Sequence, residues 1–271
     1  MLQHLWLIPV GFVIGTLGTL IGAGGGFVLV PFLLLCYPKE QPETITAISL
    51  AVVFFNAFSG SVAYARLGRI DYRSGLLLSA ATLPGAVLGA LTTAYIPRRL
   101  FDAIFGVLMM GIAVFLFLRP GRDGQKKPEK RPTHRTRTVV EADGTRHTYS
   151  YNPILGVGLS LLVGFVSSLL GIGGGIIHVP ALVHLLNFPV HIATATSHFM
   201  LAVMALAGTI VHLIAGVFSH GLRRMIALAI GVLLGAQLGA RLSGGVHGNW
   251  IVRSLAIALG FVGIRILMMA F

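Results

Sequence analysis

Acidic residues are scarce in this chain. It holds eight Asp and Glu against twenty Lys and Arg in 271 residues, and none of the eight follows Asp143. All of them fall in predicted loops or at the ends of apolar segments. Cation and proton pumps usually bury carboxylates in the transport pathway. A membrane core without them suits an anion better than a cation.

Cysteine is rarer still, since Cys36 is the only one. A single thiol excludes an internal disulfide framework and a cysteine-ligated metal site. Nucleotide-binding motifs are missing as well. The glycine-rich stretches lack the last Gly or Ala of the dinucleotide fingerprint, because Phe27 and Ile176 stand there. We therefore expect a protein that is not an enzyme and that carries no cofactor and no resident metal.

Apolar residues dominate the composition. The chain is 55% hydrophobic and 10% charged, with a mean hydropathy of +0.88, which is typical of an integral membrane protein with many spans. Its formal charge of +12 does not indicate nucleic acid. Nine of the twenty basic residues lie between Arg119 and Arg146, and most others flank apolar runs. Such residues set orientation and contact anionic lipid, so the expected partner is the lipid bilayer.

One glycine-rich stretch occurs twice. Gly22-Ala23-Gly24-Gly25-Gly26 and Gly171-Ile172-Gly173-Gly174-Gly175 lie in long apolar runs, and Pro31 and Pro180 each follow five residues later. Three adjacent glycines break a helix, whereas proline is tolerated in a first turn. The pattern predicts a helix, an unwound loop, and a new helix that begins just before the proline. Its free N–H groups and positive dipole end face the loop.

The rest of the chain repeats around these stretches. The segment Gly85–Gly89 matches Gly235–Gly239, and Thr46–Ser49 matches Thr194–Ser197. We infer an all-α integral membrane protein with two homologous halves, residues 1–118 and 153–271. Each half has one glycine-broken or re-entrant helix plus three full spans. The layout is eight spans if each broken helix crosses once, or ten elements if it is re-entrant.

Ten apolar segments carry this prediction. They are residues 5–21, 27–36, 44–65, 74–95, 100–118, 153–170, 176–187, 190–215, 222–242 and 250–270.

The polar linker at 119–152 separates the halves. Gly121 to Pro132 is charged and contains proline, which predicts a mobile segment. Thr133 to Tyr151 alternates polar and apolar residues around Asp143-Gly144, a two-residue turn signal. A β-hairpin and a disordered segment both remain open.

Basic residues predict the orientation. They favour the linker side by fifteen to five in the eight-span layout, and by fourteen to six in the re-entrant layout. We expect a multi-pass protein of a cell membrane, of the bacterial inner-membrane type, with a cytoplasmic linker. Composition leaves a homodimer open.

Paired Gly-x-Gly-Gly-Gly segments followed by proline, two homologous halves and a polar linker resemble the TauE/SafE family of sulfite exporter-like permeases. The resemblance covers residues 8–270. It implies transport of a small sulfur-containing or organic anion, such as sulfite, a sulfonate or sulfoacetate. Substrate varies within that family, so the resemblance sets a class of substrate rather than one compound.

Two hydroxyl-bearing helix stripes accompany the glycines. Three- and four-residue spacing places one set of residues on one face of a helix in each half. The sets are Thr46, Ser49, Val53, Asn56 and Gly60, then Thr194, Ser197, Leu201, Met204 and Gly208. Hydroxyls and amides donate well to an oxyanion, although hydroxyls also join helices in membranes. We expect the substrate site to include Gly24, Gly25, Gly26, Thr46, Ser49, Asn56, Gly173, Gly174, Gly175, Thr194, Ser197 and His198.

Histidine distinguishes the halves. The second half carries His178, His184, His191, His198 and His212, whereas the apolar spans of the first half have none. His198 directly follows a hydroxyl stripe, so it is a candidate partner for the anion or carrier of a coupling proton. The alternatives are a histidine-dependent divalent-metal exporter and a membrane enzyme or assembly factor. The favoured hypothesis is a secondary anion transporter driven by the membrane potential, a proton or an exchanged anion.

Overall fold

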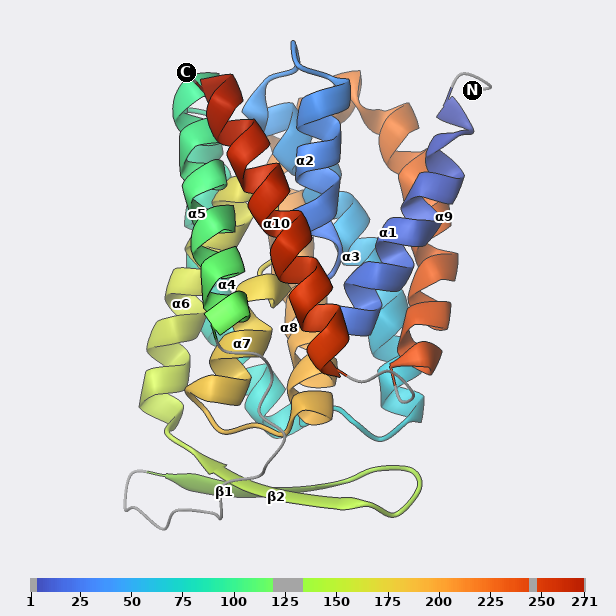
Figure 1. The fold of residues 1–271 in the computed structure, drawn as a ribbon, viewed down its shortest axis with the longest axis vertical. Coiled ribbons are helices and arrows are strands. Elements are labelled where there is room, and N and C mark those ends of the chain that lie inside the picture. The colour runs from blue at the N-terminus through green and yellow to red at the C-terminus, as the bar shows by residue number, and fades with distance from the viewer. Residues whose placement is uncertain (1–3, 119–133, 244–247, 271) are drawn as a thin grey trace.

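The computed structural model describes residues 4–118, 134–243 and 248–270. It is a helix bundle with one β-hairpin across one end (Figure 1). The first helices are α1 (Leu7–Ile21), α2 (Gly26–Cys36), α3 (Pro42–Arg66), α4 (Tyr72–Thr93) and α5 (Arg98–Leu118). The hairpin is β1 (Arg135–Val140) and β2 (Arg146–Tyr151). The last helices are α6 (Pro153–Leu170), α7 (Gly175–His184), α8 (Val190–Ile214), the 3₁₀ turn η2 (Val217–His220), α9 (Leu222–Leu242) and α10 (Gly248–Ala270). The segment Gly121 to Pro132 lies outside the described residues.

Two helix pairs turn back inside the bundle. We name the end with the hairpin the linker end, and the end where α1 begins the terminal end. Figure 1 shows α1 running inward from the terminal end and α2 returning to it, while α6 and α7 do the same from the linker end. Among the described residues, six helices are long and apolar enough to cross a membrane: α3, α4, α5, α6, α8 and α9. These helices do not confirm the eight-crossing layout.

Helix packing has the same pattern in both parts of the bundle. The largest contacts join α1 to α9, α4 to α6, α5 to α10 and α3 to α8, and exchanging α1–α5 for α6–α10 reproduces this set. Glycines permit the close approach. A Cβ at Gly85 or Gly89 would collide with the α6 backbone, and one at Gly235 or Gly239 with the α1 backbone. Small residues at four-residue spacing thus set the helix contacts.

The linker contains a β-hairpin, so the disordered alternative does not hold for residues 135–151. Its strands pair antiparallel from Arg135 opposite Tyr151 to Val140 opposite Arg146. The predicted two-residue turn was wrong, because five residues separate the paired strands. The Glu141 amide closes this loop by donating to the Thr145 carbonyl, with 2.9 Å between N and O.

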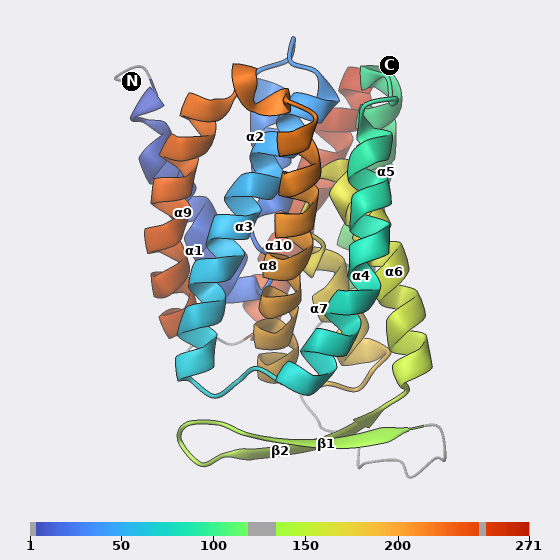
Figure 2. The same ribbon diagram turned by 180° about the vertical axis from the view of Figure 1, so that it is seen from behind.

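The hairpin is fixed to the bundle by aromatic rings and an ion pair. Tyr149 and Tyr151 are buried and pack on Phe188 in the α7–α8 loop, with ring centroids 4.4 and 5.2 Å apart. The Glu141 carboxylate accepts from Arg69 after α3 at 2.6 Å. Figure 2 shows the hairpin lying across the ends of α3, α4 and α8. It therefore joins elements from both parts of the bundle.

Asp71 is the centre of this attachment. It caps α4, is 5% exposed, and accepts from Tyr149 Oη at 2.7 Å, Ser74 Oγ at 2.6 Å and Arg137 at 3.3 Å. Its own amide donates to Thr196 of α8 at 3.1 Å. Burial opposes the charge, but the hydrogen bonds from Ser74, Tyr149 and Arg137 hold the pKa of Asp71 below its usual value. Burial and the Asp71 carboxylate raise the pKa of Tyr149, which keeps its hydroxyl a donor.

We predict that Asp71→Asn lowers the free energy of unfolding by about 1.5–3 kcal/mol, because charged hydrogen bonds are lost. The folded pKa is depressed, so this contribution is complete above the ordinary carboxyl pKa. It disappears as the pH falls through the folded value. The measurement is Tm of purified protein in detergent as a function of pH.

The matched control is Asp143→Asn at the exposed hairpin tip, where the carboxylate accepts from Thr145 of the same loop. It should leave Tm almost unchanged. Equal Tm values for Asp71→Asn and Asp143→Asn would show that the Asp71 contacts do not hold the hairpin.

Candidate functional site

The two glycine loops meet back to back in the middle of the bundle. Loop 22–25 joins α1 to α2, and loop 171–174 joins α6 to α7. A Cβ added at Gly26 would lie 2.6 Å from the Ile172 carbonyl oxygen, and one at Gly175 would lie 2.6 Å from Ala23 Cα. These distances are far below van der Waals contact, so the two backbones touch without side chains between them.

Left-handed glycines start the two inner helices. Gly25 caps α2 with φ 80° and Gly174 caps α7 with φ 78°, a region that residues with a Cβ rarely adopt. The helices begin at Gly26 and Gly175, one residue before the predicted segments 27–36 and 176–187. A glycine cap alone suffices to restart a helix here, so the proline falls in the second turn.

Pro31 and Pro180 therefore lie inside α2 and α7. Proline has no N–H, and the carbonyls of Phe27 and Ile176, four residues earlier, lack their usual helical donor.

The helix starts expose unpaired amides in a buried place. Ala23 and Gly24 donate back to the Gly18 carbonyl at 2.8 and 3.1 Å. The next three amides, of residues 25–27, have no partner within the described part of the chain, and neither do those of residues 174–176. All six residues are buried. A buried helix start without partners calls for water or a ligand, and the helix dipole favours a negative one.

The threonines of the α3 and α8 stripes pack on the two glycine loops. Gly171 packs on Thr46 of α3, while Gly22 packs on Thr194 of α8. Ser49 Oγ donates to the Gly171 carbonyl at 2.6 Å. The hydroxyl residues of each stripe thus lie on the more distant glycine loop in the sequence, while Val53 and Leu201 in the middle of the stripes contact both loops.

Ser197 donates to the Gly22 carbonyl at 3.4 Å, as Ser49 does to that of Gly171. A hydroxyl has one proton, so in this structure both serines hold the loops rather than offer a donor to a ligand.

Other polar groups close to the loops have no partner. Among the described residues, Thr46 Oγ1, Asn56 Nδ2, Ser167 Oγ and Ser168 Oγ are buried without a hydrogen bond, and each residue is 0% exposed. Buried polar groups are nearly always paired. Ser167 and Ser168 are absent from the site that the sequence predicts. The available signal was a hydroxyl three residues before the first glycine of each motif, at Thr19 and Ser168.

His198 reaches across from α8 to α1 and α3. Its Nε2 lies 3.2 Å from Thr19 Oγ1, and that hydroxyl lies 3.1 Å from Asn56 Oδ1. Gly60 makes room for the ring, since a Cβ there would lie 2.5 Å from it. Tyr64 packs edge-on at 5.8 Å between centroids. Thr19 and Tyr64 belong to this cluster although the stripe pattern did not identify them.

The remaining histidines do not gather. His178 and His212 are buried apart from His198, and His184 packs edge-on against Phe115. Among the residues that the structure describes, no three His, Cys, Asp or Glu side chains come together as metal ligands would.

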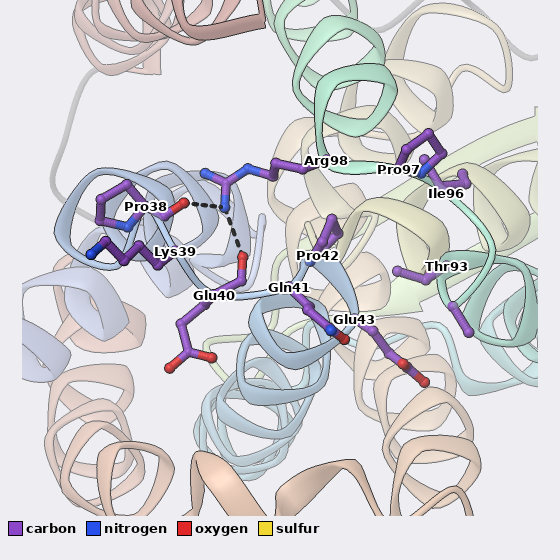
Figure 3. Close-up of a pocket in the computed structure, with 11 residues that line it drawn as sticks. Pro38, Lys39, Glu40, Gln41, Pro42, Glu43, Thr93, Ile96, Pro97 and Arg98 are labelled. Carbon is purple, nitrogen blue, oxygen red and sulfur yellow. Dashed lines mark hydrogen bonds between the residues drawn. The ribbon is translucent and has the colours of Figure 1, made fainter.

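A cavity of about 400 Å³ opens at the terminal end, away from the glycine loops. Figure 3 shows it between the α2–α3 and α4–α5 loops. Its arginine, Arg98, already donates to the carbonyl oxygens of Pro38 and Glu40 and to the Asp102 carboxylate. The cavity therefore offers no free guanidinium to an anion.

The membrane-length helices define a multi-pass membrane protein, and the relatives that it matches are named probable membrane transporters. The probable membrane transporter YunE of Bacillus subtilis is 32% identical over 96% of both chains. The probable membrane transporter MJ0441 of Methanocaldococcus jannaschii is 24% identical over 97% of this chain and 94% of its own. YdhB of Bacillus subtilis, also a probable membrane transporter, is 26% identical over 87% and 88%.

The family model described as "Sulfite exporter TauE/SafE" matches residues 7–266. The chain belongs to the TauE/SafE family and is a membrane permease or exporter. No solved structure matches it.

We predict that Gly26→Ala lowers the free energy of unfolding by about 1–3 kcal/mol, because a methyl group would overpack two touching backbones. The matched control is Gly158→Ala on α6, where an added Cβ meets nothing within 4 Å. That change should raise Tm slightly, since alanine favours a helix by about 1 kcal/mol over glycine. Thermal unfolding in detergent measures both, and similar Tm values would contradict the loop contact.

Proposed function

We propose that this protein is a secondary transporter for a small oxyanion, sulfur-containing or organic, such as sulfite, a sulfonate or sulfoacetate. The observation that carries the proposal is the set of six amides at the buried starts of α2 and α7 that find no partner among the described residues. Free hydroxyl and amide groups of Thr46, Asn56, Ser167 and Ser168 surround them. Family membership supports transport of a compound of this class.

Neutral groups suffice to hold an anion here. Taking an anion out of water costs several kcal/mol unless donors replace its hydration. Each helix start contributes about 0.3–2 kcal/mol, and each hydrogen bond to a charged group about 1.5–3 kcal/mol. Two helix starts and a few such bonds therefore offset the loss without a buried Lys or Arg.

Transport through this site requires motion. Thr46, Ser49, Asn56, Ser197 and His198 are all 0% exposed, so an anion reaches them only when the bundle opens. We infer two inverted repeats, α1–α5 and α6–α10, that rock against each other around the glycine loops. The hairpin closes the linker end in this arrangement.

Orientation follows from the direction of the helices. With α9 ending and α10 beginning at the linker end, the described basic residues on that side are Arg66, Arg69, Arg73, Arg135, Arg137, Arg146, Arg241 and Arg253. The six on the terminal side are Lys39, Arg98, Arg99, Arg223, Arg224 and Arg265. We propose that the linker is cytoplasmic and that the terminal end faces outward.

We predict that Gly25→Ala and Gly174→Ala each weaken sulfite binding at least tenfold, because a Cβ strains the left-handed cap that aims the amides. The measurement is equilibrium binding of radiolabelled sulfite to purified protein in detergent, with Tm verifying the fold. Gly158→Ala is the control and should bind as the parent does. A chelator should leave binding unchanged. Parental affinity in both folded loop variants would exclude the loops as the site.

The native Cys36 can be used to test the orientation of the protein in the membrane. Cys36 is the only cysteine, is exposed, and ends α2 at the terminal end. An impermeant maleimide should label it in intact cells. In a Cys36→Ser background, a cysteine introduced at Asp143 should react only after permeabilisation. The reverse pattern would overturn the cytoplasmic linker.

A further inference from the structure

The polar groups at the loops are unequally divided between the two halves. At the repeat spacing of the hydroxyl stripes, His198 of α8 corresponds to Leu50 of α3, and Asn56 corresponds to Met204. Leu50 packs on Gly208, as His198 packs on Gly60. The architecture is thus symmetric, but the imidazole and the amide lie on one side only. The inference below rests on the proposed anion site.

The single proton of the Thr19 hydroxyl determines the direction of the hydrogen bonds between Thr19, Asn56 and His198. Thr19 Oγ1 donates to Asn56 Oδ1, an oxygen that only accepts. Its single proton is then used, so Thr19 Oγ1 must accept from His198 Nε2. Neutral His198 therefore carries its proton on Nε2, and Nδ1 is an acceptor with a free lone pair.

Two polar atoms of this cluster are then left without a hydrogen-bond partner, one a donor and the other an acceptor. Within the part of the chain that the structure describes, Asn56 Nδ2 is a buried donor without an acceptor, and His198 Nδ1 is a buried acceptor without a donor. A fully ionised oxyanion offers only acceptors. It can satisfy Asn56, but it leaves the Nδ1 lone pair facing negative charge. One ligand satisfies both atoms only when a proton accompanies the anion.

We propose that each anion binds together with one proton, and that this proton lies at His198 Nδ1. The ligand is either an oxyanion that carries an acidic hydroxyl, which donates to Nδ1, or an ionised oxyanion that binds with a separate proton on the imidazole. In both cases the buried charge is reduced by one unit, which lowers the cost of leaving water. Thr19 is the positioning residue, because it sets which ring nitrogen is free.

The surroundings of His198 contain few competing proton sites. Thr19 approaches it from α1, and Asn56, Gly60 and Tyr64 from α3. Tyr64 is the titratable group among these contacts, and its hydroxyl donates to the Thr19 carbonyl at 2.7 Å. None of the hydrogen bonds or ion pairs described for His198 involves a charged side chain. Among these contacts, His198 Nδ1 is therefore the acceptor for the proton that accompanies the anion.

Two anions of the same shape test the proposal. At mildly acidic pH methylphosphonate is a monoanion with one P–OH group, whereas methanesulfonate is a monoanion with none. Each competes with radiolabelled sulfite for the purified full chain. Proton uptake on binding is measured by calorimetry in two buffers of different ionisation enthalpy.

The proposal predicts that methylphosphonate binds at least tenfold more tightly with no proton uptake, or that methanesulfonate binds with uptake of one proton. The first result would show that a hydroxyl of the substrate supplies the proton at His198 Nδ1. The second would show that a separate proton binds there. His198→Leu, which copies Leu50, and Thr19→Val should abolish both effects. Thr19→Ser should retain them, as should Gly158→Ala on α6, where an added Cβ meets nothing within 4 Å.

Equal binding of both anions without proton uptake would overturn the proton inference while leaving the anion site intact. Retention of the preference or of proton uptake in folded His198→Leu would overturn it as well. Absence of any competition, with no sulfite bound, would instead remove the proposed function on which the inference rests.

Discussion

The direct contact between two glycine loops is the constraint on which the rest of the structure depends. Gly26 and Gly175 leave no room for a methyl group between the loops. This contact requires α1 and α6 to end inside the bundle, and it places the starts of α2 and α7 there. Helix ends in the apolar interior are costly unless they are packed in protein or line a polar site. The same geometry that brings the loops together therefore collects their unpaired amides in one place.

Crosswise packing links this contact to the rest of the bundle. Thr46 of α3 lies on the second loop and Thr194 of α8 on the first, so a shift of one loop moves the central helix of the other half. At the linker end, Asp71 connects the hairpin to α4 and α8. The proposed alternating access would require the Asp71 contacts to break and the loop contact to persist.

Most of the fold was predictable because long apolar segments bounded by charges and glycine leave few alternatives. Helix boundaries agreed within a few residues, apart from the end of α7. The predicted segment 27–36 already contained Pro31, but the sequence placed this proline in the first turn, whereas the left-handed cap at Gly25 starts the helix early enough to put it in the second. The site residues remain a prediction, and Ser49 shows why: its spacing indicates a donor, but only coordinates reveal that its proton is committed to Gly171. Thr19 could not be identified from the sequence because its partners, Asn56 and His198, lie 37 and 179 residues away along the chain.

The central claim is that backbone amides at the two inner helix starts hold the anion. Anomalous scattering from protein crystallised with selenite, a selenium analogue of sulfite, locates the ligand directly. The account predicts a selenium peak within hydrogen-bonding reach of the amides of residues 25–27 or 174–176, near Asn56. A peak confined to the cavity beside Arg98, with none at the glycine loops, would contradict it.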